Sequence, residues 1–81
     1  MDEKKLLVSN IDKVHTTILG KERIKNNLEL DIDDIINYIK NKIIKKESTV
    51  YKKGKNLYCE IDKIRVTINS YNYCIITCHY I

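Results

Sequence analysis

The hydrophobic pattern changes its period near residue 47, and this change limits the folds that the chain can adopt. Before that point apolar residues recur at the three- and four-residue spacing of amphipathic helices, and after it they alternate with polar residues as in half-buried strands. Helices followed by strands favour an α+β fold, because each element must bury its apolar side against another layer. With 81 residues, the chain is long enough for one modest core, so we expect a single domain over residues 1–81.

Two helices are predicted before residue 30. Apolar residues at helical spacing predict a short amphipathic helix over residues 3–14 and a second helix over residues 18–27. Thr16 or Thr17 can cap the second helix, since a threonine hydroxyl accepts a hydrogen bond from a free N–H of the first turn. Gly20 costs about 1 kcal/mol there relative to alanine, which indicates that it allows a close approach. The expected apolar stripe of this helix is Leu19, Ile24 and Leu28.

A third helix has the strongest pattern and is predicted over residues 32–46. Asp31 suits its N-cap, and the acidic residues that follow favour the positive end of the helix dipole. Lysines gather in its last turns, where cations are favoured. The face expected to be buried consists of Ile35, Ile36, Ile39 and Ile43.

Four strands are predicted after the third helix, from segments of alternating polarity that read STVYKK, NLYCEID, KIRVTINS and YCIITCHYI. The breaks between them lie at Gly54, at Asp62-Lys63 and at Ser70-Tyr71-Asn72, and each is short enough for a hairpin. The fold class that we expect is therefore α+β, with two or three N-terminal helices packed on one face of a four-stranded antiparallel β-meander.

Alternation also assigns the two faces of this sheet. The apolar face includes Leu57, Cys59, Ile61, Ile64, Val66 and Ile68. On the last strand two alternating sets compete for this face, and we expect the set with the cysteines because free cysteine buries readily. That set is Cys74, Ile76 and Cys78, and the competing set is Tyr73, Ile75, Thr77 and His79. The opposite face is then polar and carries Tyr58, Glu60, Arg65, Thr67, Asn69, Tyr73, Thr77 and His79.

Charge, cysteine content and hydropathy limit the cellular compartment and the kinds of partner that we expect for the protein. The formal charge of +4 permits a polyanionic partner without requiring one. The three cysteines include no C-x-x-C pair, so we expect neither a disulfide framework nor a zinc site, and free thiols fit a reducing compartment. The N-terminal segment lacks the apolar stretch of a signal peptide, and no segment is apolar enough to span a bilayer. We therefore expect a cytoplasmic protein with no cofactor, no metal and no membrane partner.

The polar face collects groups that can perform acid–base chemistry. Cleavage of RNA without a metal needs a base for the 2′-hydroxyl, an acid for the leaving 5′-oxygen, and cations for the charged phosphorane. The candidate bases are Glu60 and a neutral histidine, the candidate acids are His79 and His15, and the candidate cations are Arg23, Arg65 and Lys21. An ordinary solvated sheet face is the alternative interpretation.

Sequence motifs add a resemblance. From Lys13 to His79 the chain resembles a family of short bacterial proteins of unknown function, on the segments VHTTILGKERIKNNL, DIDDIINYIKNKI, GKNLY and VTINSYNYCIITCHYI. More loosely, the order of a histidine, an Arg-containing helix, a second helix and strands ending in IIT is similar to BrnT-type toxins of the barnase–EndoU–colicin–RelE ribonuclease superfamily. That resemblance implies helices on one sheet face, RNA cleavage on the other, and catalytic positions at His15, Arg23, Thr77 and His79.

Our first functional hypothesis is a small intracellular, toxin-like protein that cleaves RNA without a metal. Its candidate substrate-binding residues are Lys21, Tyr58, Glu60, Arg65 and Thr67. The second hypothesis is a non-catalytic binding or inhibitory module from a mobile element, whose partner is a protein such as an antitoxin or a target enzyme. The third is DNA binding through the lysine-rich third helix, which the expected packing of that helix on the sheet disfavours.

Overall fold

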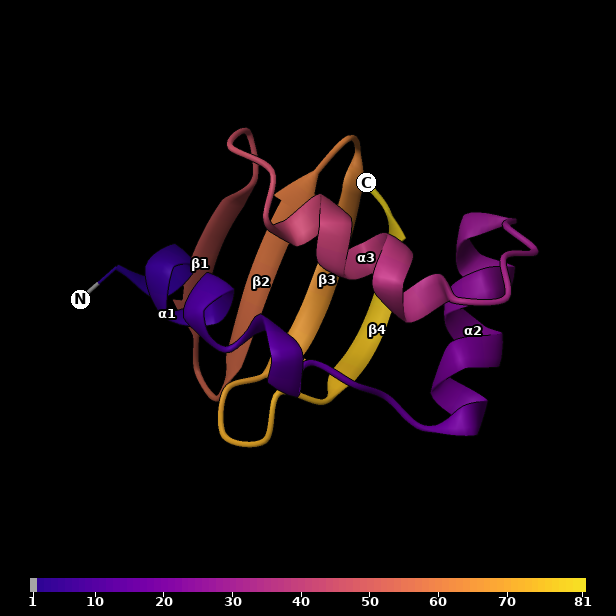
Figure 1. The fold of residues 1–81 in the computed structure, drawn as a ribbon, viewed down its shortest axis with the longest axis horizontal. Helices are drawn as coiled ribbons and strands as arrows, with labels where there is room; N and C mark the ends of the chain where they lie inside the picture. The colour runs from indigo at the N-terminus through magenta and orange to yellow at the C-terminus, as the bar shows by residue number, and fades with distance from the viewer. Residues whose placement is uncertain (1) are drawn as a thin grey trace.

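The computed structural model describes residues 2–81, and it confirms the predicted α+β fold with a four-stranded antiparallel meander (Figure 1). The helical elements are α1 (Glu3–Ser9), a short 3-10 helix η1 (Ile11–Lys13), α2 (Ile18–Leu28) and α3 (Ile35–Ile43). The strands are β1 (Thr49–Lys53), β2 (Asn56–Ile61), β3 (Ile64–Asn69) and β4 (Ile75–Tyr80). Within this part of the chain no helix is long and apolar enough to cross a membrane.

The strands lie in the order β1-β2-β3-β4, each antiparallel to its neighbour. The β2–β3 hairpin has a two-residue turn in which both Asp62 (φ 50°) and Lys63 (φ 66°) adopt positive φ. This conformation matches the right-handed twist of the flanking strands, which explains why so short a break suffices. This short turn therefore fixes the register of β2 against β3.

All three α-helices pack against the apolar face of the sheet. In Figure 1, α1 lies over β1, α3 lies over β2, and α2 lies beside β4, in agreement with the contacts between these elements. The fully buried side chains of the helices include Leu7, Ile24, Leu28, Ile35, Ile39 and Ile43. They meet Leu57, Cys59, Val66, Ile68, Ile75 and Cys78 from the sheet in one core cluster. The helices leave the other face of the sheet uncovered.

The first predicted helix is shorter than expected, because α1 ends at Ser9 instead of continuing to Val14. Asn10 interrupts it: its backbone N–H and its side-chain amide both donate to the carbonyl of Leu6. The chain then makes the single 3-10 turn η1 before Val14, which is buried.

The predicted start of α2 is confirmed, and its apolar stripe is corrected. Thr17 is the N-cap, and its hydroxyl accepts a hydrogen bond of 3.0 Å from the N–H of Gly20. A side chain on Gly20 would collide with the Thr16 hydroxyl, since an added Cβ would lie 2.1 Å from it, so the predicted close approach is present. Leu19, however, is 70% exposed and takes no part in the core, because only the later turns of α2 face the sheet with Ile24.

The third helix is also shorter than predicted. Its N-cap is Asp34 rather than Asp31, with the Asp34 carboxylate accepting from the N–H of Asn37 at 3.0 Å. The helix ends at Ile43 instead of Lys46, and the following residues turn toward β1. The prediction placed the first turn too early because three aspartates within four residues, in the sequence DIDD, are all suitable caps.

The expected core set of β4 is partly wrong. Thr77 is opposite Thr67, but the next pair is Ile75 with Ile68, so Ile76 is an extra residue in a β-bulge. The bulge reverses the alternation: Ile75 is 2% exposed while Ile76 is 48% exposed. Of the predicted set only Cys78 is fully buried, and Cys74 is half-buried. Tyr73, which we expected on the polar face, instead packs against the core cluster.

Candidate functional site

The uncovered side of the sheet, here called the open face, is defined by strand register. Residues paired in an antiparallel sheet share a face, so the pairings arrange its side chains in rows that cross the strands. One row contains Tyr51, Tyr58, Thr67 and Thr77. The next contains Thr49, Glu60, Arg65 and His79. A third contains Lys53, Asn56 and Asn69.

Glu60 is the centre of a hydrogen-bond network on this face. Its Oε2 accepts from the Tyr51 hydroxyl at 2.7 Å and from Nε of Arg65 at 3.1 Å. The Tyr51 hydrogen bond, followed by that from Arg65, holds the pKa of the Glu60 carboxyl below its usual value. The same bonds raise the pKa of Tyr51 and of Arg65. Glu60 is therefore a carboxylate at neutral pH.

The Glu60 network leaves reactive atoms unused. Both hydrogen bonds to Glu60 end on Oε2, and within residues 2–81 Oε1 accepts none. Arg65 uses only Nε, so its two terminal amino groups make no hydrogen bond to the described protein. The side chains of Glu60 and Arg65 are 30% and 37% exposed, respectively, so solvent or a ligand can reach them.

His79 extends the same row onto β4, directly opposite Arg65. Its Nδ1 lies 3.0 Å from the carbonyl oxygen of Tyr80. A carbonyl only accepts, so Nδ1 carries the hydrogen and Nε2 is the nitrogen left to exchange a proton. Glu60, Arg65 and His79 thus occupy one row on three adjacent strands, and each has a free functional atom.

His15 lies elsewhere. It forms a parallel bridge with Cys74, in which its N–H donates to the carbonyl of Tyr73 and its carbonyl accepts from the N–H of Ile75. His79 lies five positions after Cys74 along the chain, roughly 15 Å along the strand. The structure therefore does not bring the two histidines together.

Arg23 and Lys21 are exposed residues of α2. Arg23 lies one helical turn before Asn27, whose amide donates to the carbonyl of Cys78 at 3.3 Å. Arg23 consequently lies beside the outer edge of β4, outside the rows of the open face. The open face contains six of the nine site residues predicted from sequence: Tyr58, Glu60, Arg65, Thr67, Thr77 and His79.

Sequence reasoning missed Tyr51. Its ring stacks on Tyr58 with centroids 5.4 Å apart and an interplanar angle of 18°, and its hydroxyl holds Glu60. Alternation within STVYKK gives Tyr51 and Thr49 a common face, but only the register of β1 against β2 shows that this face carries Glu60.

The buried thiols are poor nucleophiles. Burial raises the pKa of Cys59 to about 11 and that of Cys78 to about 12, so both are protonated at neutral pH. Among residues 2–81 there is no group of three or more His, Cys, Asp or Glu side chains placed to hold a metal ion. The chemistry of the open face is thus that of Glu60, Arg65, His79 and the nearby hydroxyls.

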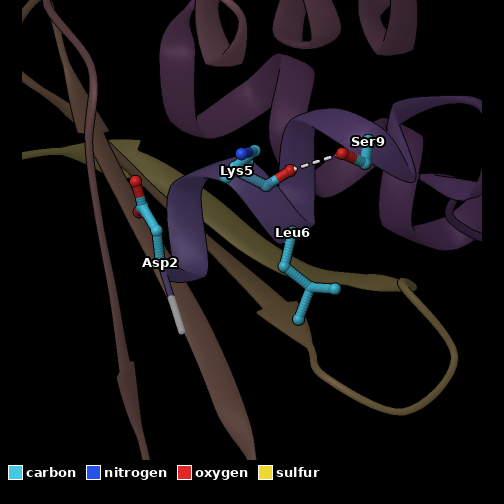
Figure 2. Close-up of a pocket in the computed structure, with 4 residues that line it drawn as sticks. All are labelled: Asp2, Lys5, Leu6 and Ser9. Carbon is cyan, nitrogen blue, oxygen red and sulfur yellow. Dashed lines mark hydrogen bonds between the residues drawn. The ribbon is translucent and has the colours of Figure 1, made fainter.

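Two surface hollows lie away from the open face. Figure 2 shows one of about 320 Å³, whose lining comes from α1 and its N-cap: Asp2, Lys5, Leu6 and Ser9. Ser9 donates to the backbone carbonyl of Lys5 within this hollow. The other, of about 350 Å³, lies at the end of α2 and the loop after it. Neither is lined by Glu60, Arg65 or His79.

Comparison with known proteins identifies the family. A family model described as "Protein of unknown function (DUF3781)" matches residues 8–79, so the chain belongs to this family. No curated protein and no solved structure matches the chain. The comparisons thus support the resemblance to a family of short proteins of unknown function, and they give no support to the looser resemblance to BrnT-type toxins.

Proposed function

We propose that the open face cleaves RNA by acid–base chemistry without a metal ion. The observation that carries this proposal is the row Glu60–Arg65–His79, because register alone places a carboxylate, a guanidinium and an imidazole on adjacent strands. Within residues 2–81, each has a functional group that makes no hydrogen bond: Oε1 of Glu60, the terminal amino groups of Arg65 and Nε2 of His79. These are the three roles that transfer of a phosphoryl group from the 5′-oxygen to the 2′-oxygen requires.

In the proposed reaction, Oε1 of Glu60 takes the proton from the ribose 2′-hydroxyl. The 2′-oxygen forms a bond to phosphorus while the bond from phosphorus to the 5′-oxygen breaks. His79 enters this step as the imidazolium, with Nδ1–H bonded to the carbonyl of Tyr80, and its Nε2–H gives a proton to the leaving oxygen, which leaves a neutral imidazole. The terminal amino groups of Arg65 stabilise the negative charge of the phosphorane. The products are a 2′,3′-cyclic phosphate and a 5′-hydroxyl. DNA, which lacks the 2′-hydroxyl, is not a substrate.

Backbone spacing supports these roles. Glu60 and His79 are two strand spacings apart, about 10 Å between their backbones, with Arg65 between them. A phosphodiester placed over Arg65 then has the base on one side and the acid on the other. Thr77 lies in the neighbouring row and is half-buried, so its hydroxyl can donate to a phosphate oxygen. Thr67, its partner on β3, is only 7% exposed and offers little surface to a ligand.

The two histidines provide a matched test. His79→Ala removes the proposed acid, and Glu60→Gln removes the base while keeping a similar shape; we expect each to lower the rate of RNA cleavage by 100-fold or more, in line with ~10²–10⁴ for acid–base groups. His15→Ala is the control, because His15 makes the same kind of Nδ1 contact to a carbonyl, that of Lys13, but lies off the open face. It should retain the wild-type rate.

The assay uses a labelled single-stranded RNA in excess chelator, with far-ultraviolet circular dichroism to confirm that each variant is folded. Intact RNA after incubation with folded wild-type protein refutes the proposal. So does equal loss of activity in His15→Ala and His79→Ala, because that result would move the chemistry away from the row. A toxin-like role inside the cytoplasm belongs to the same proposal, since cellular RNA would be its target.

The second candidate function is a protein-binding module. It is favoured by exposed apolar side chains at the start of α2, where Ile18 is 81% and Leu19 is 70% exposed. A protein partner such as an antitoxin or a target enzyme would cover them. Under this hypothesis Ile18→Lys abolishes binding to the partner, whereas His79→Ala leaves it unchanged.

A further inference from the structure

The open face extends from the row of Glu60, Arg65 and His79, here called the catalytic row, toward the β1–β2 hairpin. From the row of Glu60 to the row of Asn56 the distance along β2 is four residues, or about 14 Å. The row of Tyr51 and Tyr58 lies between them. The tyrosine rings are held in place, since they stack on each other and the Tyr51 hydroxyl is bonded to Glu60. Fixed, accessible aromatic rings are surfaces on which nucleic-acid bases stack, and Tyr51 is 37% exposed.

The hairpin at the end of this path is strongly basic. It carries Lys52, Lys53 and Lys55 around Gly54, and all of these residues are exposed. The chain between Ser48 and Cys59 contains no aspartate or glutamate. Within residues 2–81 the ion pairs involve other cations, Lys42, Lys45 and Arg65, so the hairpin lysines are not neutralised by a protein carboxylate.

A third aromatic residue lies at the same end of the sheet. Tyr71, in the β3–β4 loop, is 74% exposed. Its loop is fastened to the hairpin, because the N–H and the hydroxyl of Ser70 both donate to the carbonyl of Lys55, at 3.0 and 2.8 Å. The carboxamide of Asn69 also accepts from the N–H of Tyr71 at 2.8 Å. The backbone at Tyr71 is thus held close to Lys55, and its exposed ring takes no part in the core.

We infer that the open face binds single-stranded RNA that runs from the hairpin to the catalytic row. Its bases stack on Tyr71 and on the Tyr51–Tyr58 pair, and its phosphates contact Lys53 and Lys55. A duplex does not fit this surface, because its bases are stacked on one another and are not available to the tyrosines. The inference rests on the proposed function of the open face for the direction of the strand, but binding can be measured without cleavage.

The test uses wild-type protein and a fluorescein-labelled ten-nucleotide RNA with 2′-O-methyl groups, which cannot form the 2′-oxygen nucleophile. Fluorescence anisotropy should show tighter binding to this strand than to the same strand in a duplex. Tyr71→Ala should weaken binding by about 5- to 100-fold, the range of one lost base stack, while Tyr71→Phe should retain it. These are affinity measurements, so their outcome does not depend on catalysis.

A charge variant tests the contribution of the hairpin lysines to binding. Lys53→Gln with Lys55→Gln should weaken binding and lower the slope of log K against log salt by about 1.4, as expected for two lost phosphate contacts on a single strand. The control is Lys5→Gln with Lys13→Gln, which removes two exposed charges from α1 and η1 in the helix layer. It should leave the slope within about 0.5 of wild type.

The outcomes separate the two proposals. Equal affinity for the single strand and the duplex overturns the inference. So does wild-type affinity in both the hairpin-lysine variant and Tyr71→Ala. Binding with these dependences but without cleavage of unmodified RNA supports the inference and refutes the proposed function. Cleavage that is insensitive to the hairpin and to Tyr71 supports the proposed function and refutes the inference.

Discussion

The two faces of the sheet are built from alternate residues of the same strands, but they follow different physical constraints. On β3, Val66 and Ile68 are fully buried against the helices, whereas Arg65, between Ile64 and Val66, faces outward and is bonded to Glu60. The buried face is determined by removal of apolar surface from water. The open face has no such requirement, so its side chains are free to serve another purpose.

This difference between the two faces identifies the residues whose type is not explained by the stability of the fold. A solvated sheet face needs only polar side chains with β propensity, and the threonines of this face meet that need. Glu60, Arg65 and His79 add a carboxylate, a guanidinium and an imidazole in one row, and Tyr51 fixes the carboxylate. The chemistry that we propose therefore lies on the face where core packing places the fewest constraints on residue type.

The largest expected effect compares two residues of one strand. Ile68→Ala should lower the free energy of unfolding by about 3–4 kcal/mol, because it leaves a cavity under the helices. Arg65→Ala on the same strand should lower it by less than about 1 kcal/mol, since its ion pair with Glu60 is partly exposed. Chemical denaturation of the two variants measures both values. Equal losses would mean that the open face also contributes to the core.

The next effect concerns the bulge in β4. Ile75→Thr should cost about 2–3 kcal/mol, because it places a hydroxyl in the core and removes apolar volume. Ile76→Thr should cost less than about 1 kcal/mol, since this side chain is 48% exposed. Both variants keep a β-branched residue, so strand propensity changes little. Urea midpoints measure both effects. A larger loss for Ile76→Thr than for Ile75→Thr would indicate that Ile76 is the buried residue, as in a strand without a bulge, and would contradict the structure.

The smallest effect is a pH dependence on the open face. Hydrogen bonds from Tyr51 and then Arg65 hold the pKa of Glu60 below its ordinary value of 4.5, which the unfolded chain recovers. The stabilisation is therefore fully present above pH ~4.5, and it is lost as the pH falls through the lower pKa of the folded state. Glu60→Gln should show a shallower loss of stability on acidification than wild type.

The control for this measurement is Glu47→Gln. Glu47 is exposed and forms no ion pair within the described chain. Its replacement should leave the acid limb of the stability curve as in wild type. If Glu47→Gln and Glu60→Gln flatten the curve equally, the Glu60 network has no special part in the pH dependence.

Local patterns in the sequence determined much of this fold. The two-residue period placed Leu57 and Cys59 on one face and Tyr58 and Glu60 on the other, and the structure agrees. Capping chemistry limited the N-cap of α2 to Thr16 or Thr17, and the structure has Thr17. These features depend on neighbours within a few residues, so the sequence alone predicts them. The boundaries of α1 and α3 were less accurate, because several polar residues there compete as caps.

Only the tertiary structure decided which distant groups meet. Alternation cannot reveal the bulge at Ile76, because the extra residue appears only when β4 is paired with β3. Register likewise aligned His79 with Arg65 and Glu60 and brought in Tyr51, whereas the bridge to Cys74 held His15 apart from them. The sequence supplied the chemical groups, and strand pairing, a long-range interaction between backbones, determined which of them form the candidate site.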